Sequence, residues 1–155
     1  MVLDRLKPRD SMGFLTWKSA RIFTNELAAR FAASGLDITV EQWRALLPLS
    51  KFDGLNQGNL CGILNQEKTG VSRLVAALEK RGLVRRVQDE SDRRVKRLFI
   101  TDAGRRLLET SVDIVIDCRD EMVNHIDPDD VAVCKRVLWQ IVVRYAGDCA
   151  GKCEE

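Results

Sequence analysis

The stretch TGVSRLVAALEKRGLVRRVQDESDRRVKRLFITDAG, residues 69–104, changes from a helical to a strand-like apolar spacing and decides the fold. Its first part carries apolar residues three and four positions apart: Val71, Leu74, Val75 and Leu78. This spacing predicts a helix over residues 68–81, which Gly82 ends. After the glycine, apolar and charged residues alternate in LVRRV and again in VKRLFI, with the polar segment QDESDRR between them. The alternation predicts a β-hairpin over residues 83–100 with a charged tip.

The sequence before this stretch predicts three further helices. The first covers residues 12–34 and has one apolar stripe: Trp17, Ala20, Phe23, Leu27 and Phe31. Thr39 and Gln42 have the spacing of a capping box, so a second helix is expected to begin there. Its apolar face is assigned to Val40, Trp43 and Leu47. A short helix at residues 56–64 then leads through a polar link into the helix at residues 68–81, an order that is typical of a helix-turn-helix motif.

Two long helices are predicted after the hairpin. Thr101 is expected to cap the first, whose apolar side comprises Leu108, Val112, Val115, Ile116, Met122 and Val123. The segment DPDD, residues 127–130, favours the start of the second, because proline suits the first turn and acidic residues suit the helix dipole. Its stripe comprises Val131, Cys134, Leu138, Ile141, Val142 and Tyr145. We therefore expect one mostly α-helical domain over residues 1–155, with a winged helix-turn-helix lobe at residues 39–100 between outer helices at 12–34 and 101–147.

Positive charge is concentrated in the middle of the chain. The 155 residues carry a formal net charge of only +2. Residues 67–106 hold twelve Lys/Arg and six Asp/Glu, whereas the remainder holds thirteen and seventeen, so the excess is local and indicates an anion-binding face. The N-terminal MVLDRLKPRDSMGF lacks the apolar run of a signal peptide, and no stretch has the apolar length of a membrane span. A cytoplasmic chain with no membrane partner is expected.

The segments TGVSRLVAALEKRGLVRR and DESDRRVKRLFITDAG together resemble the MarR family of winged helix-turn-helix transcription regulators. The most specific part is Asp92-Arg93-Arg94, followed by a strand and by LFITDAG. The resemblance in motif covers residues 55–104, and in helix order it covers nearly the whole chain. It implies a homodimer in which the outer helices are the dimerisation helices, and it implies double-stranded DNA as the partner. Gly70 departs from the family pattern, which usually has a small polar residue there.

The candidate DNA-binding residues fall on two elements. On the helices they are Asn56, Gln57, Lys68, Thr69, Ser72 and Arg73, and on the hairpin they are Arg86, Asp92, Arg93, Arg94 and Lys96. A helix fits the major groove, where Arg73 can pair with guanine, while Asn56 and Gln57 can hold the backbone. The resemblance favours Arg94 as the side chain that enters the minor groove, with Asp92 orienting an arginine. The alternative is a solvated hairpin whose acidic residues form local salt bridges.

The remaining motifs give weaker indications. A phosphate-binding glycine loop, a nucleophile elbow and a metalloprotease motif are all missing, and His125 is the single histidine, so we expect no enzyme, no cofactor and no metal. Five cysteines are an odd number and suit reduced thiols. Cys61, Cys118 and Cys134 are interpreted as small core residues, and Cys149 with Cys153 as an incidental pair in the tail.

A small-molecule effector is expected to modulate DNA binding. It would change the spacing between the helices at residues 68–81 of the two copies in the dimer. Candidate pocket residues are Phe14, Trp17, Trp43 and Phe52, although aromatic residues at helical spacing more often belong to the core. Two other functions stay open. One is a winged helix that binds an acidic protein partner, and the other is a DNA-binding regulator switched by its thiols.

Overall fold

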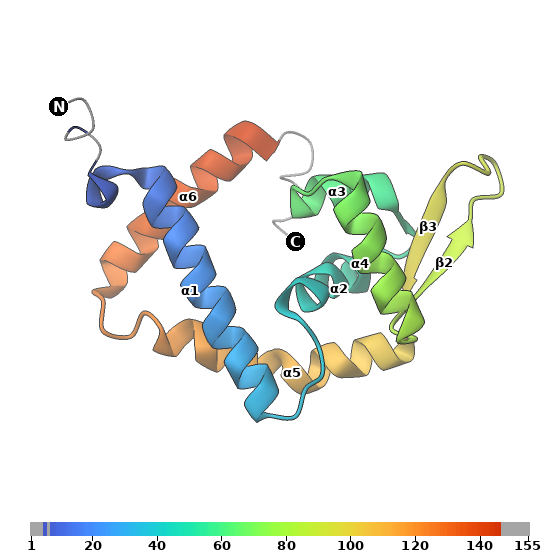
Figure 1. The fold of residues 1–155 in the computed structure, drawn as a ribbon, viewed down its shortest axis with the longest axis horizontal. Coiled ribbons are helices and arrows are strands. Elements are labelled where there is room, and N and C mark those ends of the chain that lie inside the picture. The colour runs from blue at the N-terminus through green and yellow to red at the C-terminus, as the bar shows by residue number, and fades with distance from the viewer. Residues whose placement is uncertain (1–4, 6, 147–155) are drawn as a thin grey trace.

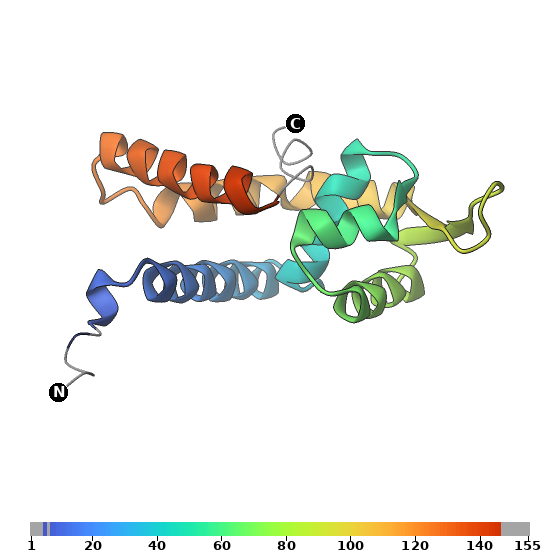
Figure 2. The ribbon, with the colours of Figure 1, turned by 90° about the horizontal axis from the view of Figure 1, so that it is seen from above.

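The computed structural model describes residues 5 and 7–146, which form six α-helices and a small antiparallel sheet (Figure 1). In chain order the elements are α1 Met12–Ala33, α2 Val40–Lys51, β1 Leu55–Asn56, α3 Gln57–Leu64, α4 Lys68–Lys80, β2 Val84–Gln88, β3 Lys96–Ile100, α5 Asp102–Glu121 and α6 Pro128–Ala146. Elements α2 to β3 form a lobe at one end, and α1 and α6 lie apart from each other at the other end (Figure 2). The predicted mostly helical, winged helix-turn-helix fold is confirmed. No described helix is both long enough and apolar enough to cross a bilayer.

Local signals explain where the helices begin and end. Thr39 and Gln42 form the predicted capping box, each side chain accepting a hydrogen bond from the other residue's backbone N–H, at 3.1 and 3.3 Å. Gly82 has a φ of 69°, the left-handed conformation that ends α4. A side chain at Gly104 would collide with the carbonyl oxygen of Leu83. This glycine therefore lets α5 begin close against the β2–β3 hairpin, residues 83–100, which is the wing.

The sheet has three strands in the order β1-β3-β2, all antiparallel. The sequence predicted β2 and β3, whose register pairs Val84 with Ile100 and Gln88 with Lys96. It did not predict β1, which has only two residues and pairs Leu55 with Leu98. Because β1 leads directly into α3, this short strand attaches the base of the hairpin to the helix-turn-helix.

The core lies within the lobe and at its junction with α1 and α5. Its largest fully buried apolar side chains are Phe31, Val40, Leu46, Leu49, Leu60, Val71, Val75, Leu78, Val84 and Leu98. The prediction that Leu47 faces inward is wrong, since Leu47 is 37% exposed while Leu46 and Leu49 are fully buried. Trp43 is buried as predicted, and its indole N–H donates a 2.8 Å hydrogen bond to the hydroxyl of Ser111 on α5.

The inward face of α5 also differs from the predicted one. Val112 and Ile116 are 43% and 39% exposed, whereas Ser111 and Cys118 are buried. The hydroxyl of Ser111 can be buried because it also donates to a backbone carbonyl one turn earlier, at Leu107, at 2.7 Å. Hydrogen bonding therefore places a polar residue where apolar spacing predicted a neighbouring valine.

Helices α1 and α6 leave most of their apolar side chains exposed. Of the predicted α1 stripe only Leu27 and Phe31 are buried, and α6 buries none of its residues within the described chain. On α6 the exposed apolar side chains are Val133, Val137, Leu138, Ile141, Val142, Val143 and Tyr145. Cys134 is exposed, so its assignment to the core is wrong. Residue 147 of the predicted last helix and the pair Cys149 and Cys153 lie outside the described residues.

Candidate nucleic-acid interface

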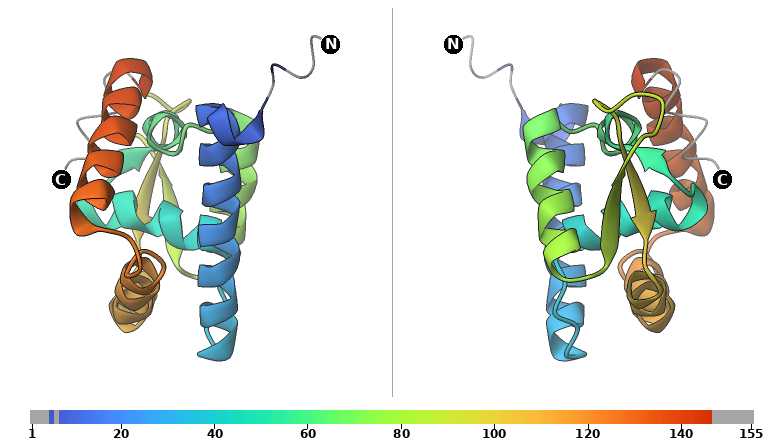
Figure 3. Two further views of the ribbon diagram at one scale, coloured as in Figure 1. Left: turned by 90° about the vertical axis from the view of Figure 1, so that its left-hand side faces the viewer. Right: turned by 90° about the vertical axis from the view of Figure 1, so that its right-hand side faces the viewer.

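A groove of about 380 Å³ lies between the first turns of α3 and α4 and the wing. It is lined by Asn56, Gln57, Gly58, Lys68, Ser72, Arg86, Arg94, Val95 and Lys96. Seven of these nine lining residues are predicted DNA-binding residues, and four carry positive charge. Among the described residues that line the groove, none is acidic. Figure 3 shows α4 and the hairpin together at this end of the molecule.

Helix α4 directs its apolar side inward and its polar side outward. Val71, Val75 and Leu78 are fully buried, which fixes the rotation of the helix. Thr69 and Arg73 are therefore exposed, although neither lines the groove. Within the described residues, the side chain of the N-cap residue Glu67 accepts no hydrogen bond from the first turn of the helix. The backbone N–H groups at the start of α4 are left available to an anion.

The start of α3 is organised differently. The side-chain oxygen of Asn56 accepts a 2.7 Å hydrogen bond from the backbone N–H of Asn59, so Asn56 caps the helix. Its amide nitrogen remains a donor, and Asn56 lines the groove. Gln57 is half-buried beside it. The two residues predicted to hold a DNA backbone thus lie at the groove, and one of them also has a structural role.

The wing tip, residues 89–95 between β2 and β3, contains the expected pairing of an aspartate with an arginine. Asp92 Oδ1 accepts hydrogen bonds from the backbone N–H of Arg94 at 3.0 Å and from its guanidinium Nε at 3.2 Å. The Arg94 side chain is nevertheless 91% exposed and lines the groove. Arg93 and Lys96 are also exposed. The tip therefore presents positive charge to solvent at the edge of the groove.

Arg86 has a second role that sequence reasoning missed. Its guanidinium donates two hydrogen bonds to Glu79 Oε2, from Nε at 3.0 Å and from Nη2 at 2.8 Å. This contact joins β2 to the last turns of α4, and the Arg86 hydrogen bond lowers the pKa of Glu79 below its usual range. Arg86 holds the wing against α4, and its contact with DNA stays a prediction.

A cluster at the base of the wing tip was also missed. Asp89 is buried and accepts hydrogen bonds from Ser91 and from the guanidinium of Arg97. Arg85 on β2 has its guanidinium carbon 4.3 Å from the ring centre of Phe99, its pairing partner on β3. The alternative of local salt bridges is thus partly present, because two of the hairpin's acidic residues pair with arginines.

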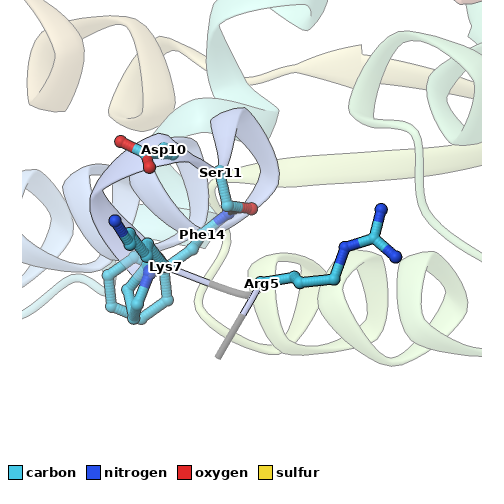
Figure 4. Close-up of a pocket in the computed structure, with 6 residues that line it drawn as sticks. Arg5, Lys7, Asp10, Ser11 and Phe14 are labelled. Carbon is cyan, nitrogen blue, oxygen red and sulfur yellow. Dashed lines mark hydrogen bonds between the residues drawn. The ribbon is translucent and has the colours of Figure 1, made fainter. Parts of the chain in front are cut away.

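Of the four aromatic candidates for an effector pocket, only Phe14 and Trp17 come together, with their ring centres 5.9 Å apart. Trp43 belongs to the core, Phe52 is half-buried, and Phe14 and Trp17 are 40% and 55% exposed, so these last two are not core residues in the described chain. Phe14 lines a hollow of about 370 Å³ together with Arg5, Lys7, Pro8, Asp10 and Ser11 (Figure 4). Trp17 lines a separate hollow of about 390 Å³ between α1 and α2.

The described cysteines are in three different environments. Cys118 is buried, and burial raises the pKa of its thiol, which makes it less reactive. Cys61 is half-buried and Cys134 is exposed. His125 is exposed in the turn that follows α5.

One family model and several known proteins match parts of this chain. The model of the MarR family matches residues 36–95, which span the helix-turn-helix and most of the wing. A curated HTH-type transcriptional regulator, YybA of Bacillus subtilis, is 28% identical over 72 residues, 46% of this chain. That match covers 48% of YybA, so this chain aligns with about half the length of that relative.

Solved structures share the fold over most of the chain. A variant of MarR from Escherichia coli complexed with operator DNA has a TM-score of 0.80 at 21% identity, covering 92% of this chain and 99% of that one. CouR from Rhodococcus jostii, bound to p-coumaroyl-CoA, has a TM-score of 0.76 at 22% identity, covering 90% and 96%. The resemblance seen in the sequence is confirmed over residues 36–95, which match the MarR family model, and most of the chain shares the fold of these solved structures.

Proposed function

We propose that the chain acts as a homodimer that binds a pseudo-palindromic operator, with α4 in the major groove and the wing, residues 83–100, in the adjoining minor groove. The observation that carries this proposal is the basic groove between α3, α4 and the wing, which is lined by four cationic side chains. Phosphates would replace the counterions of these side chains, which is the main source of affinity in DNA binding. The operator complex of the MarR variant supports the same mode of binding.

The roles of the individual residues follow from their positions. Arg73 reads a guanine edge from the exposed side of α4, with Thr69 and Ser72 as neighbouring contacts to bases or phosphates. The phosphate contacts come from Asn56, Gln57, Lys68, Arg86, Arg93 and Lys96. Arg94 enters the minor groove, oriented by Asp92. Because Arg86 is already bonded to Glu79, its contribution to phosphate binding is expected to be smaller than that of Lys96.

A second copy of the chain would cover the exposed apolar faces of the outer helices. Contiguous apolar surface of this kind marks an interaction site. We assign dimerisation to residues 12–34 and 101–147 and DNA binding to residues 39–100. A two-fold axis would then place two α4 helices on half-sites roughly 34 Å apart, one turn of DNA.

An effector would act by favouring one spacing of the two lobes over another. The ligand of CouR, p-coumaroyl-CoA, supports a small molecule in this role. Since only Phe14 and Trp17 of the four aromatic candidates lie together, and both side chains are exposed, a site that includes them is expected to need the second copy.

The decisive experiment is selection of bound duplexes from random-sequence DNA with the purified chain. The expected result is a pseudo-palindromic consensus. For roughly 6–10 phosphate contacts, affinity is expected to fall by about 10³–10⁵ between 50 and 200 mM salt. A protein-interaction module would instead enrich no sequence, because any DNA binding by its basic hairpin would be non-specific. That outcome would reject the proposal.

A further inference from the structure

Asp89 stands out because it is the one charged residue among the described positions that is buried, at 9% exposure. It follows directly after β2, at the base of the most positively charged part of the surface. One oxygen, Oδ1, accepts hydrogen bonds from the Ser91 backbone N–H at 2.9 Å, from the Ser91 hydroxyl at 2.5 Å and from the Asp92 backbone N–H at 3.1 Å. The other oxygen, Oδ2, accepts from the Arg97 guanidinium Nε.

Arg97 connects this carboxylate to the lobe. Besides Asp89, its guanidinium donates a 3.2 Å hydrogen bond from Nη1 to the carbonyl oxygen of Gly54. Gly54 lies in the turn between α2 and β1, 43 residues away in sequence, and its φ of 72° favours glycine. Asp89 is thereby fixed to the body of the helix-turn-helix through one arginine.

Asp89 also holds the residue that orients Arg94. The Asp92 N–H is bonded to Asp89, and the Asp92 carboxylate in turn accepts two hydrogen bonds from Arg94. These contacts form a continuous path from Gly54 through Arg97, Asp89 and Asp92 to Arg94. Hydrogen bonds to one buried carboxylate therefore help to set the conformation of the tip. They act together with the Gln88 side chain, which donates to the Arg93 carbonyl at 2.6 Å, and with the Asp89 N–H, which donates to the Val95 carbonyl at 3.0 Å.

We propose that Asp89 is a positioning residue for DNA recognition, which holds the wing tip so that Arg94 is presented to the duplex without itself contacting DNA. The proposal rests on the function proposed above. A carboxylate near a phosphate backbone opposes binding by repulsion, so an acidic residue here needs another role. Its burial against four donors supplies one. The Ser91 hydroxyl and the Arg97 guanidinium keep its pKa well below the usual range, so it is ionised wherever DNA binding would be measured.

The test compares two substitutions that remove the same negative charge from neighbouring positions. Asp89→Asn disturbs the hydrogen-bonded cluster, whereas Glu90→Gln changes an exposed side chain that has no hydrogen bond or ion pair within the described residues. The probe is a duplex selected by the unmodified chain. Asp89→Asn is expected to weaken binding about tenfold and to reduce the salt slope by about one. Glu90→Gln is expected to bind equally well or more tightly, because less charge repels the phosphates.

If Asp89 acted only by repelling phosphates, Asp89→Asn would strengthen DNA binding. Equal or tighter binding by this variant would therefore overturn the inference. A second check uses Arg94→Ala. In that background Asp89→Asn is expected to cause no further loss, because the side chain that it positions is already gone. An undiminished tenfold loss in that background would show that Asp89 does not act through Arg94.

Two measurements separate positioning from general loss of structure. Preference among half-site variants read by α4 is expected to be unchanged in Asp89→Asn. If Asp89→Asn folds poorly, Ser91→Ala removes one hydrogen bond without changing charge, and it is expected to weaken binding in the same direction by a smaller factor. Unchanged binding by Ser91→Ala would then reject the inference. If the unmodified chain binds no duplex, the proposed function fails as well. A failure confined to the Asp89 and Ser91 variants leaves that function standing.

Discussion

The winged lobe and the outer helices both carry regularly spaced apolar side chains, yet the fraction of these side chains that the chain itself buries differs between them. In the lobe, Leu46, Leu60 and Val75 are completely buried by other parts of the same chain. On α6, side chains of the same type, such as Ile141 and Val142, remain 43% and 38% exposed. Apolar periodicity therefore identifies a surface to be covered, and only the folded chain tells whether the cover is internal. The following predictions, in order of decreasing effect, test this difference.

Leu46→Ala is expected to destabilise the chain by about 2–5 kcal/mol, because it opens a cavity in the lobe core. The measurement is the free energy of unfolding by denaturant. Leu47→Ala, one residue along, is the matched control, since Leu47 is 37% exposed and its loss is expected to be much smaller. Equal losses for the two variants would mean that Leu47 is covered by something outside the single chain.

Ile141→Asp is expected to weaken self-association by roughly a hundredfold, about 3 kcal/mol, because it buries an unpaired charge in the proposed dimer interface. Sedimentation over a range of concentrations measures the effect. Gln140→Asp makes the same change of charge at an exposed polar position on the same helix and is expected to have less effect. If the unmodified chain is monomeric in this measurement, α6 does not have its proposed role in dimerisation.

Ser111→Ala is expected to cost about 1–3 kcal/mol of stability, because the buried N–H of Trp43 would lose its acceptor at the junction of lobe and α5. Thermal or denaturant unfolding checks this value. Thr110→Ala is the control, since its exposed hydroxyl bonds only to carbonyls of its own helix. A loss for Ser111→Ala no greater than the control's would show that the junction does not depend on this hydrogen bond.

Arg73→Ala is expected to cost about 1–3 kcal/mol of binding to the selected operator and to relax the preference for one base pair. Titration of the operator and of its point variants measures both effects. Arg136→Ala removes the same charge from α6, outside the lobe, and is expected to leave the preference unchanged. If both variants bind alike, base reading does not involve Arg73.

Arg94→Ala is expected to have the smallest and least sequence-dependent effect, a decrease of about one in the salt slope. Binding constants measured at several salt concentrations give the slope. An unchanged slope would mean that the wing tip does not contact the duplex.

The sequence predicted the order of the helices and the hairpin because strong local signals mark them. The Thr39–Gln42 capping box, Gly82 and Thr101 all act where they were expected to act. Strand β1 was missed because two residues are too few to show a period, and its pairing partner, Leu98, lies 43 positions away.

Side-chain environments were less predictable than elements. Apolar spacing alone does not distinguish Leu46 from Leu47, or Val112 from Ser111, because the choice depends on which neighbouring helix covers the face. The candidate site was predicted as a set of residues from charge and resemblance. The pairings of Arg86 with Glu79 and of Arg97 with Asp89 were not, since each joins elements that meet only after folding.

The open first turn of α4 has a consequence for hydrogen exchange. Within the described chain, the side chain of its N-cap residue, Glu67, accepts no hydrogen bond from the backbone N–H groups of this turn. The start of α3, in contrast, is capped by Asn56. We expect the α4 amides near Lys68 and Thr69 to exchange with deuterium sooner than those of the buried turns that follow. A bound duplex would slow them, so mass spectrometry of this one peptide can report occupancy without any label on the DNA.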